Sequence, residues 1–184
     1  MPGNEFTILC VCTANICRSP VAASLLSELL GPEIRVRSAG TYARPGAAMA
    51  EPMARRLRAR SVRSADFAAR RLTAADLASS DLVLGMTKGH RAEIVEVLPA
   101  AVRRTFTLKE FARLANALLT GDVADGSAAE RLAAMVPLLA RHRTPSPSSD
   151  DIADPYGRTE DDYDRAFAEI DEAAWTIARA VAPI

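Results

Sequence analysis

The feature that most constrains the fold lies near the start of the chain, where an apolar run meets a short loop and then a helix. Residues Phe6–Val11 (FTILCV) are apolar and partly β-branched, which predicts a strand buried on both faces. The turn-like segment Cys12–Cys17 follows. The next stretch, Arg18–Leu30, predicts a helix, since Ser19 can cap it, Pro20 suits its first turn and a Gly-Pro pair ends it.

Strands and helices continue to alternate along the chain. The predicted strands are Ile34–Arg37, Asp81–Met86 and Arg104–Leu108, and the predicted helices are Ala47–Arg60, Arg91–Leu98, Lys109–Leu119 and Asp161–Val181. This alternation indicates an α/β fold of three layers (α/β/α), with a central, mostly four-stranded parallel sheet of Rossmann-like type and right-handed crossovers. A ligand is expected at the carboxyl end of the first strand.

One stretch of the chain, residues 113–150, departs from this alternation. The segment Gly121–Gly126 is predicted to be a loop, and Ala128–Arg143 a helix that Pro137 kinks or breaks. Residues 144–149 (TPSPSS) have the composition of a flexible linker. We interpret residues 1–184 as one domain with an atypical insertion over 113–150, which either gates Asp154 or docks a partner.

The balance and the placement of charges bear on which partners the protein can bind. Lys plus Arg and Asp plus Glu both number 23, so nothing in the net charge favours binding to nucleic acid or to a membrane surface. Arginines crowd residues 55–71 and acidic residues crowd 150–172, which indicates either two solvated faces or a basic rim that attracts anions.

The compartment follows from the cysteines and from the start of the chain. Cys10, Cys12 and Cys17 are too few and too close for a disulfide framework and fit a reducing compartment. No signal peptide and no run of roughly 18 apolar residues is present. We therefore expect a cytoplasmic protein without membrane insertion, monomeric or weakly oligomeric.

The loop after the first strand carries the chemistry. A helix N-terminus beside successive backbone N–H groups is an anion site, and the planar fork of Arg18 can bind two phosphate oxygens. A thiol in that field is stabilised as a thiolate nucleophile. Only Cys12, six positions before Arg18, closes a Cys-x5-Arg loop, and Ser19 can donate a hydrogen bond to its sulfur.

These residues resemble a known family. Val11–Pro20 (VCTANICRSP) is similar to the signature of the low-molecular-weight protein-tyrosine phosphatases, and Ser38–Thr41, Asp81–His90 and Asp154–Gly157 resemble further family segments in the same order. The resemblance covers roughly residues 5–112 and 151–182. It implies metal-independent hydrolysis of protein phosphotyrosine through a cysteinyl-phosphate intermediate, without a cofactor.

The resemblance also implies roles for single residues. Cys12 would attack phosphorus and Asp154 would act as general acid. The other implied residues are Arg18 with the backbone of Thr13, Ala14, Asn15, Ile16 and Cys17 as the phosphate cradle, Asn15 as the residue that shapes the loop, and Ser19 as the group that stabilises the thiolate.

Specificity depends on the walls of the site. Related protein-arginine phosphatases typically have threonine at the position of Ile16, so an apolar Ile16 favours a phenyl ring. Tyr42 and Tyr156 are candidates for a wall along the substrate ring, or are plain surface residues. Cys17 could protect Cys12 through a disulfide, or could be a small buried residue.

Other functions remain open on the sequence alone. A phosphatase for phosphoarginine or small phosphate esters shares every motif. Arsenate reductase would need a cysteine after Cys17, and a phosphate-binding module would be expected to lack Cys12, Arg18 or Asp154. A metal site has little support, because His90 and His142 do not lie at ligand spacing from the cysteines, and we expect His90 to belong to its helix or to the surface.

Overall fold

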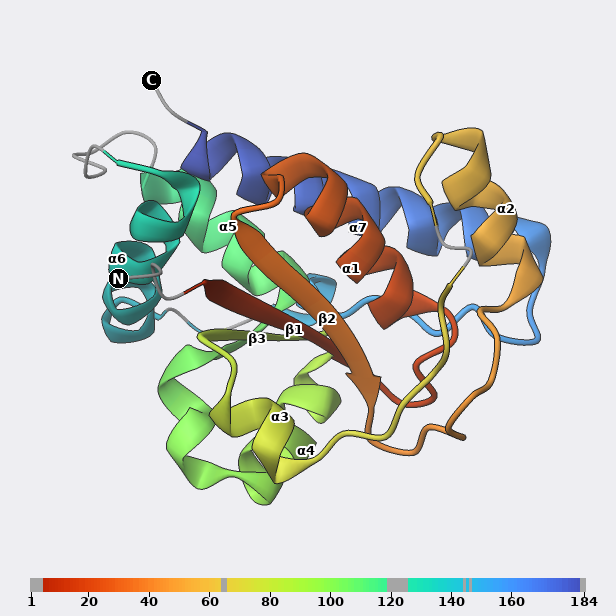
Figure 1. The fold of residues 1–184 in the computed structure, drawn as a ribbon, viewed down its shortest axis with the longest axis horizontal. Coiled ribbons are helices and arrows are strands. Elements are labelled where there is room, and N and C mark those ends of the chain that lie inside the picture. Colours follow the sequence, from red (N-terminus) through yellow and green to blue (C-terminus); the bar gives the residue numbers. More distant parts are fainter. Residues whose placement is uncertain (1–4, 64–65, 119–125, 144, 146, 183–184) are drawn as a thin grey trace.

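A four-stranded parallel sheet forms the centre of the molecule, with strand order β2-β1-β3-β4 (Figure 1). The computed structural model describes residues 5–63, 66–118, 126–143, 145 and 147–182. The strands are β1 (Phe6–Cys12), β2 (Ile34–Gly40), β3 (Leu82–Gly85) and β4 (Thr105–Thr107). The predicted α/β fold with a central parallel sheet is confirmed.

Helices cover both faces of this sheet. The helices are α1 (Arg18–Leu30), α2 (Glu51–Ala59), α3 (Ala74–Ala78), α4 (Lys88–Val97), α5 (Leu108–Leu118), α6 (Ala128–Arg141) and α7 (Glu160–Val181), with 3-10 turns η1 (Pro99–Arg104) and η2 (Ser148–Asp150). Figure 1 shows α1, α5 and α7 on one face, and α3 and α4 on the other.

The sequence of β1 explains why it is one of the two interior strands. All seven of its residues are buried. Ile8 and Cys10 join the main core with α1, α5, α6 and α7, whereas Leu9 and Val11 join a smaller core with Leu77 and Ile94 on the α3–α4 side. Alternate side chains of a strand point to opposite faces, so only a continuous apolar run can serve both cores.

The helices differ most from the predictions at α2, at α3 and at α4, which begins at Lys88 and not at the predicted Arg91. The helix expected from Ala47 begins at Glu51, because Ala47 and Ala50 use their backbone groups elsewhere: Ala50 N donates to Ile16 O, and Ala47 O accepts from Ala69 N. The helix α3 was not predicted. Its five residues are too few for a periodic signal, although a capping box of Thr73 and Asp76 marks its start.

Two expected roles of single residues are wrong. Ser19 does not cap α1, because Cys17 occupies the N-cap position without a side-chain bond and Ser19 already lies in the first turn. Pro137 does not break α6, which runs continuously from Ala128 to Arg141. Burial of Leu132, Met135 and Leu139 on its inner face can offset the hydrogen bond that a proline removes.

Much of the stretch 113–150 packs on the main core. Residues 113–118 are the end of α5, and the buried face of α6 belongs to the same hydrophobic cluster as α1 and α7. Most of the predicted Gly121–Gly126 loop, and residues 144 and 146 of the predicted linker, lie outside the described residues. That the stretch is an insertion stays a prediction.

Within the residues described, no helix is long and apolar enough to cross a membrane.

Candidate active site

The loop of residues 12–19, called here the Cys12 loop, lies between the carboxyl end of β1 and the start of α1 and is shaped by Asn15. Asn15 is fully buried and has a left-handed backbone, with φ of 55°. Its Nδ2 donates to Ser19 Oγ at 3.0 Å and to Ser38 Oγ at 2.9 Å, and its Oδ1 accepts from Arg70 N at 3.0 Å. Asparagine tolerates this conformation better than most residues, and its amide here joins three segments.

The carboxyl end of β2 closes tightly against the same loop. A Cβ atom on Gly40 would lie 2.5 Å from Thr13 O and 2.9 Å from Asn15 N, so no larger residue fits there. Beyond it, Thr41 N donates to Cys12 O and Tyr42 N donates to Thr13 O. Gly40, the last residue of β2, therefore has a steric reason: two stretches of backbone touch at this point.

The three cysteines differ in their surroundings. Cys12 Sγ lies 2.9 Å from Ser19 Oγ, as the predicted hydrogen bond requires. Burial raises the pKa of Cys17 to about 12, with a smaller contribution from the negative charge of Asp154, and burial also raises the pKa of Cys10. Cys10 and Cys17 are therefore protonated thiols at neutral pH. Both are free, and a Cys12–Cys17 disulfide stays a prediction.

Arg18 extends from the start of α1 to the segment that holds Asp154. Its side chain is only 5% exposed, and Nη2 donates to Asp154 Oδ2 at 2.7 Å, while Nη1 donates to Ile152 O at 3.1 Å. Its Nε is buried and has no hydrogen-bond partner in the described part of the chain. A buried unpaired guanidinium N–H is costly, and an anion in the Cys12 loop could satisfy it.

The segment of residues 150–154, called here the acid segment, is anchored at several points. Ile152 N donates to Met86 O, and Asp151 Oδ1 accepts at 2.7 Å from Lys88 N at the start of α4. The buried carboxylate of Asp150 pairs with Arg113 of α5 at 2.9 Å. Asp154, at the free end, keeps a side chain that is 49% exposed.

His90 contacts the Cys12 loop, which the sequence did not predict. Its Nε2 lies 2.9 Å from Thr13 Oγ1, and its Nδ1 lies 2.9 Å from Thr87 Oγ1. Burial, aided by the charge of Arg18, lowers the pKa of His90 to about 4, so the imidazole is neutral at pH 7. His90 does lie in its helix, but it is buried and not at the surface. The cap at Thr87 was the one local signal, because its side chain accepts from His90 N.

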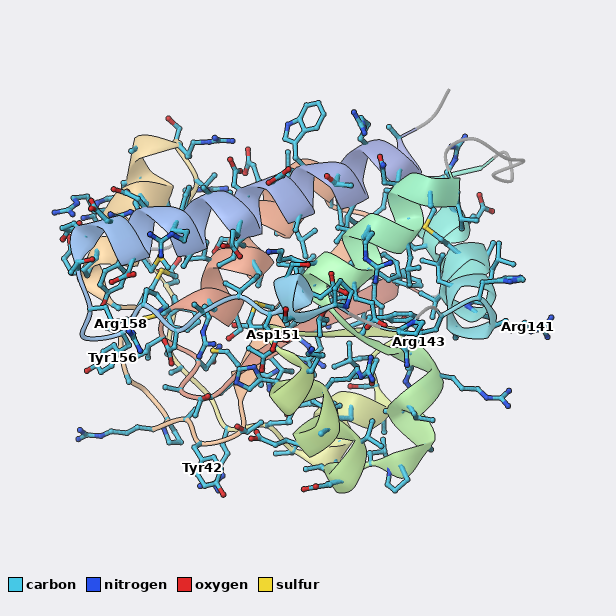
Figure 2. The ribbon with its side chains drawn as sticks, turned by 180° about the vertical axis from the view of Figure 1, so that it is seen from behind. Tyr42, Arg141, Arg143, Asp151, Tyr156 and Arg158 are labelled. Carbon is cyan, nitrogen blue, oxygen red and sulfur yellow. The ribbon has the colours of Figure 1, made fainter. Side chains whose placement is uncertain are left out.

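The two predicted wall tyrosines are both strongly exposed, Tyr42 at 72% and Tyr156 at 63%. Figure 2 shows them at the end of the molecule where the Cys12 loop lies. Tyr156 N donates to Asp154 Oδ1 at 3.2 Å, and the guanidinium of Arg71 lies 5.5 Å from the ring centre of Tyr42. Ile16 is partly buried against the main core.

The assembled site can bind an anion and can present a sulfur to it. Cys12, the backbone of 13–17, Arg18, Ser19 and Asp154 come together, as predicted, at the carboxyl end of β1. No group of three or more His, Cys, Asp or Glu side chains that could hold a metal ion occurs in the described ranges.

Comparison with known proteins places this site in a family. Residues 7–127 match the family model for "Low molecular weight phosphotyrosine protein phosphatase". The chain is 38% identical over 120 residues to the protein-arginine-phosphatase of Geobacillus stearothermophilus, which covers 65% of this chain and 78% of that protein. It is 36% identical over 102 residues to the low molecular weight protein-tyrosine-phosphatase Etp of Escherichia coli (strain K12). That match covers 54% of this chain and 66% of Etp.

Solved structures agree with the sequence comparison. The crystal structure of the Erwinia amylovora tyrosine phosphatase AmsI superposes with a TM-score of 0.72 and 26% identity, covering 95% of this chain and 91% of the other. The family match spans well over half of the chain and includes the whole Cys12 loop. The chain therefore belongs to the low molecular weight phosphotyrosine protein phosphatase family.

Proposed function

We propose that the protein hydrolyses phosphotyrosine in proteins through a cysteinyl-phosphate intermediate, without a metal ion. The observation that carries this proposal is the convergence of Cys12, Arg18 and Asp154 on one loop, with Arg18 Nη2 2.7 Å from Asp154 Oδ2. A nucleophile, a cation and a proton donor on the same phosphate site are the groups that phosphoryl transfer from an ester oxygen requires.

In the first step the thiolate of Cys12 attacks phosphorus and the bond to the tyrosine oxygen breaks. The loop N–H groups and Arg18 stabilise the charge on the three phosphoryl oxygens. Arg18 Nε, which is buried and unpaired, is available for one of these oxygens. Asp154, protonated at this stage, gives its proton to the departing phenolic oxygen.

In the second step water attacks the cysteinyl phosphate. Asp154, now ionised, takes a proton from the water, and the sulfur leaves as a thiolate. Ser19 Oγ, 2.9 Å from Cys12 Sγ, can donate a hydrogen bond to that thiolate. The products are phosphate and free enzyme, so each turnover consumes one water and needs no other reactant.

The apolar side chain of Ile16 supports tyrosine as the substrate residue. Ile16 sits in the Cys12 loop and is partly exposed, so it can contact a phenyl ring. The exposed rings of Tyr42 and Tyr156 flank the same end of the molecule and can pack along that ring (Figure 2).

Phosphoarginine is a second candidate substrate, because the Geobacillus stearothermophilus relative is named a protein-arginine-phosphatase. The two substrates differ in the group bonded to phosphorus, a phenolic oxygen or a guanidinium nitrogen. A threonine hydroxyl can hydrogen-bond a guanidinium, whereas Ile16 cannot.

A matched set of peptides tests the proposal. Purified protein is assayed in EDTA against one peptide carrying phosphotyrosine, phosphoserine or phosphoarginine, with Cys12→Ser as the inactive control. We expect release of phosphate from phosphotyrosine alone, and none with Cys12→Ser. Release from phosphoarginine alone would replace the first candidate by the second.

The variant Ile16→Thr sharpens the choice between the two candidates. If Ile16 excludes the guanidinium, this variant increases phosphoarginine hydrolysis relative to phosphotyrosine hydrolysis. An unchanged ratio would remove Ile16 from the determinants of specificity.

A further inference from the structure

The two charge clusters of the sequence largely neutralise each other in the fold. Arg56 of α2 pairs with Asp164 at 2.7 Å and with Glu160 at 3.0 Å, both on α7, and Arg60 pairs with Asp171 at 2.8 Å. The arginines of α2 therefore do not form a free basic rim, and most of their charge is already compensated within the molecule.

Several other arginines are exposed and form no ion pair among the described residues, and we call three of them the rim arginines: Arg44, Arg71 and Arg158. None of the three has a carboxylate within ion-pair distance in the described part of the chain, in contrast to the arginines of α2. Arg71 lies over the exposed ring of Tyr42, with its guanidinium carbon 5.5 Å from the ring centre.

Backbone contacts place the rim arginines around the site. Arg44 follows Tyr42 by two residues, and Tyr42 N is bonded to Thr13 O of the Cys12 loop. Arg158 follows the acid Asp154 by four residues, in a turn in which Arg158 N donates to Pro155 O. Figure 2 shows Arg158 and Tyr156 beside each other, at the same end of the molecule as Tyr42.

Arg158 forms no close ion pair within the described residues, although, after the larger effect of the hydrogen bonds from Thr159, its charge helps to lower the pKa of Asp162. Several other carboxylates near it in the sequence are engaged elsewhere. Asp154 is bonded to Arg18, and Asp151 accepts from Lys88 N. Glu160 is paired with the arginines of α2. The positive charge at the rim therefore faces solvent and whatever substrate chain enters the site.

We infer that the rim arginines bind acidic side chains that flank the phosphorylated residue, so that the preferred substrates are phosphotyrosines in acidic sequences. This inference rests on the proposed function and adds the sequence context of the substrate. Arg44 and Arg71 lie on the β2 side of the site and Arg158 on the acid-segment side, so aspartate or glutamate on both sides of the phosphotyrosine can be contacted.

The expected selectivity is moderate and depends on salt. Each exposed ion pair contributes little, about two- to threefold in binding, so three together correspond to about tenfold. The Debye length falls from about 10 Å at 0.1 M salt to about 3 Å at 1 M, so high salt suppresses the preference.

Three peptides of one length measure this preference. Phosphotyrosine is flanked by glutamate, glutamine or lysine at the same positions, and kcat/KM is determined in 0.1 M and 1 M NaCl. At the lower salt we expect kcat/KM for the glutamate peptide to exceed that for the glutamine peptide by about tenfold, with the lysine peptide lowest. At 1 M NaCl the three values converge.

Variants locate the effect. Arg44→Gln and Arg158→Gln each lower the glutamate-to-glutamine ratio by about two- to threefold, and the triple variant with Arg71→Gln brings it close to one. Arg141→Gln is the matched control, because Arg141 is also exposed, has no carboxylate partner in the described part of the chain, and lies at the opposite end (Figure 2). We expect its ratio to equal that of the wild type.

The outcomes separate the inference from the proposed function. Equal hydrolysis of the three peptides at 0.1 M NaCl overturns the inference and leaves the proposed function standing. A ratio lowered as much by Arg141→Gln as by Arg158→Gln also overturns it, since the effect would then reflect overall charge. No hydrolysis of any phosphotyrosine peptide overturns both.

Discussion

The Cys12 loop and the acid segment meet at Arg18, yet they are held in place by different forces. Within the Cys12 loop the contacts are buried hydrogen bonds between uncharged groups, centred on Asn15. The acid segment depends on charged groups, through the Asp150–Arg113 and Asp154–Arg18 pairs.

The difference teaches where the site is rigid and where it can adjust. Buried neutral hydrogen bonds are little affected by salt, and breaking one leaves a buried polar group without a partner. Ion pairs near the surface are weaker and screened by salt. We therefore expect phosphate binding to follow the Cys12 loop and proton transfer to follow the acid segment, and the two can be impaired separately.

The largest separation between proton transfer and phosphate binding should come from Asp154→Asn. Loss of general acid catalysis is expected to lower kcat on phosphotyrosine peptides by about 10²–10⁴, which corresponds to about 3–5 kcal/mol. A 4-nitrophenyl ester, whose leaving group needs no proton, should lose much less. Steady-state kinetics on both substrates measure this, with Asp161→Asn as an exposed acidic control on α7. Equal losses on both substrates would contradict a proton-donor role.

Substitution of Asn15 should destabilise the Cys12 loop. Asn15→Ala removes three hydrogen bonds of about 1 kcal/mol each and puts alanine at a positive φ, so the free energy of unfolding should fall by about 3–4 kcal/mol. Urea unfolding measures it. Asn15→Gly relieves only the backbone strain, so its free energy of unfolding should lie between those of Asn15→Ala and the wild type. Asn116→Ala, which removes an exposed amide bonded to Arg179, should change the free energy of unfolding by well under 1 kcal/mol.

The contact between His90 and the loop predicts a dependence of stability on pH. The folded pKa of His90 is lowered from 6.5 to about 4, so the folded protein binds fewer protons than the unfolded chain between these values. The corresponding stability is complete above pH 6.5 and is lost as the pH falls to about 4, by up to about 3 kcal/mol.

Unfolding midpoints at pH 7, 6, 5 and 4 test this prediction. In His90→Asn the additional loss between pH 6.5 and 4 should disappear, whereas His142→Asn, which changes an exposed histidine, should behave like the wild type. A pH profile identical in the wild type and His90→Asn would show that other groups cause the acid sensitivity.

The smallest expected effect concerns the anchor of the acid segment. Arg113→Met leaves the buried carboxylate of Asp150 without this partner and should cost about 1–2 kcal/mol, because Arg113 itself is partly exposed to water. We expect a severalfold lower kcat on phosphotyrosine peptides, with unchanged affinity for phosphate in a Cys12→Ser background.

Calorimetry of phosphate binding and turnover rates supply the two measurements, and Arg103→Met, at an exposed arginine of η1, is the control. If Arg113→Met weakens phosphate binding as much as it slows turnover, the two regions are not independent.

Local patterns accounted for much of the fold and for the reactive loop. The apolar run of β1 and the Cys-x5-Arg spacing each lie within a few residues, so their physics can be recognised without the rest of the chain. The role expected for Asp154 came only from the resemblance of its segment to the family. The short helix α3 and the unbroken α6 escaped prediction, because a five-residue helix has no period and the cost of Pro137 is offset by packing against distant residues.

The sequence by itself determined that a strand, a loop with the Cys-x5-Arg spacing and a helix follow one another, because backbone preference and side-chain period act over neighbouring residues. Only the tertiary structure decided which charges meet. Arg56 and Asp164 are 108 positions apart, Arg113 and Asp150 are 37 apart, and His90 contacts Thr13 across 77 positions. Whether an arginine forms an ion pair depends on which residues the fold brings beside it. The sequence alone therefore does not distinguish the paired arginines of α2 from the exposed rim arginines.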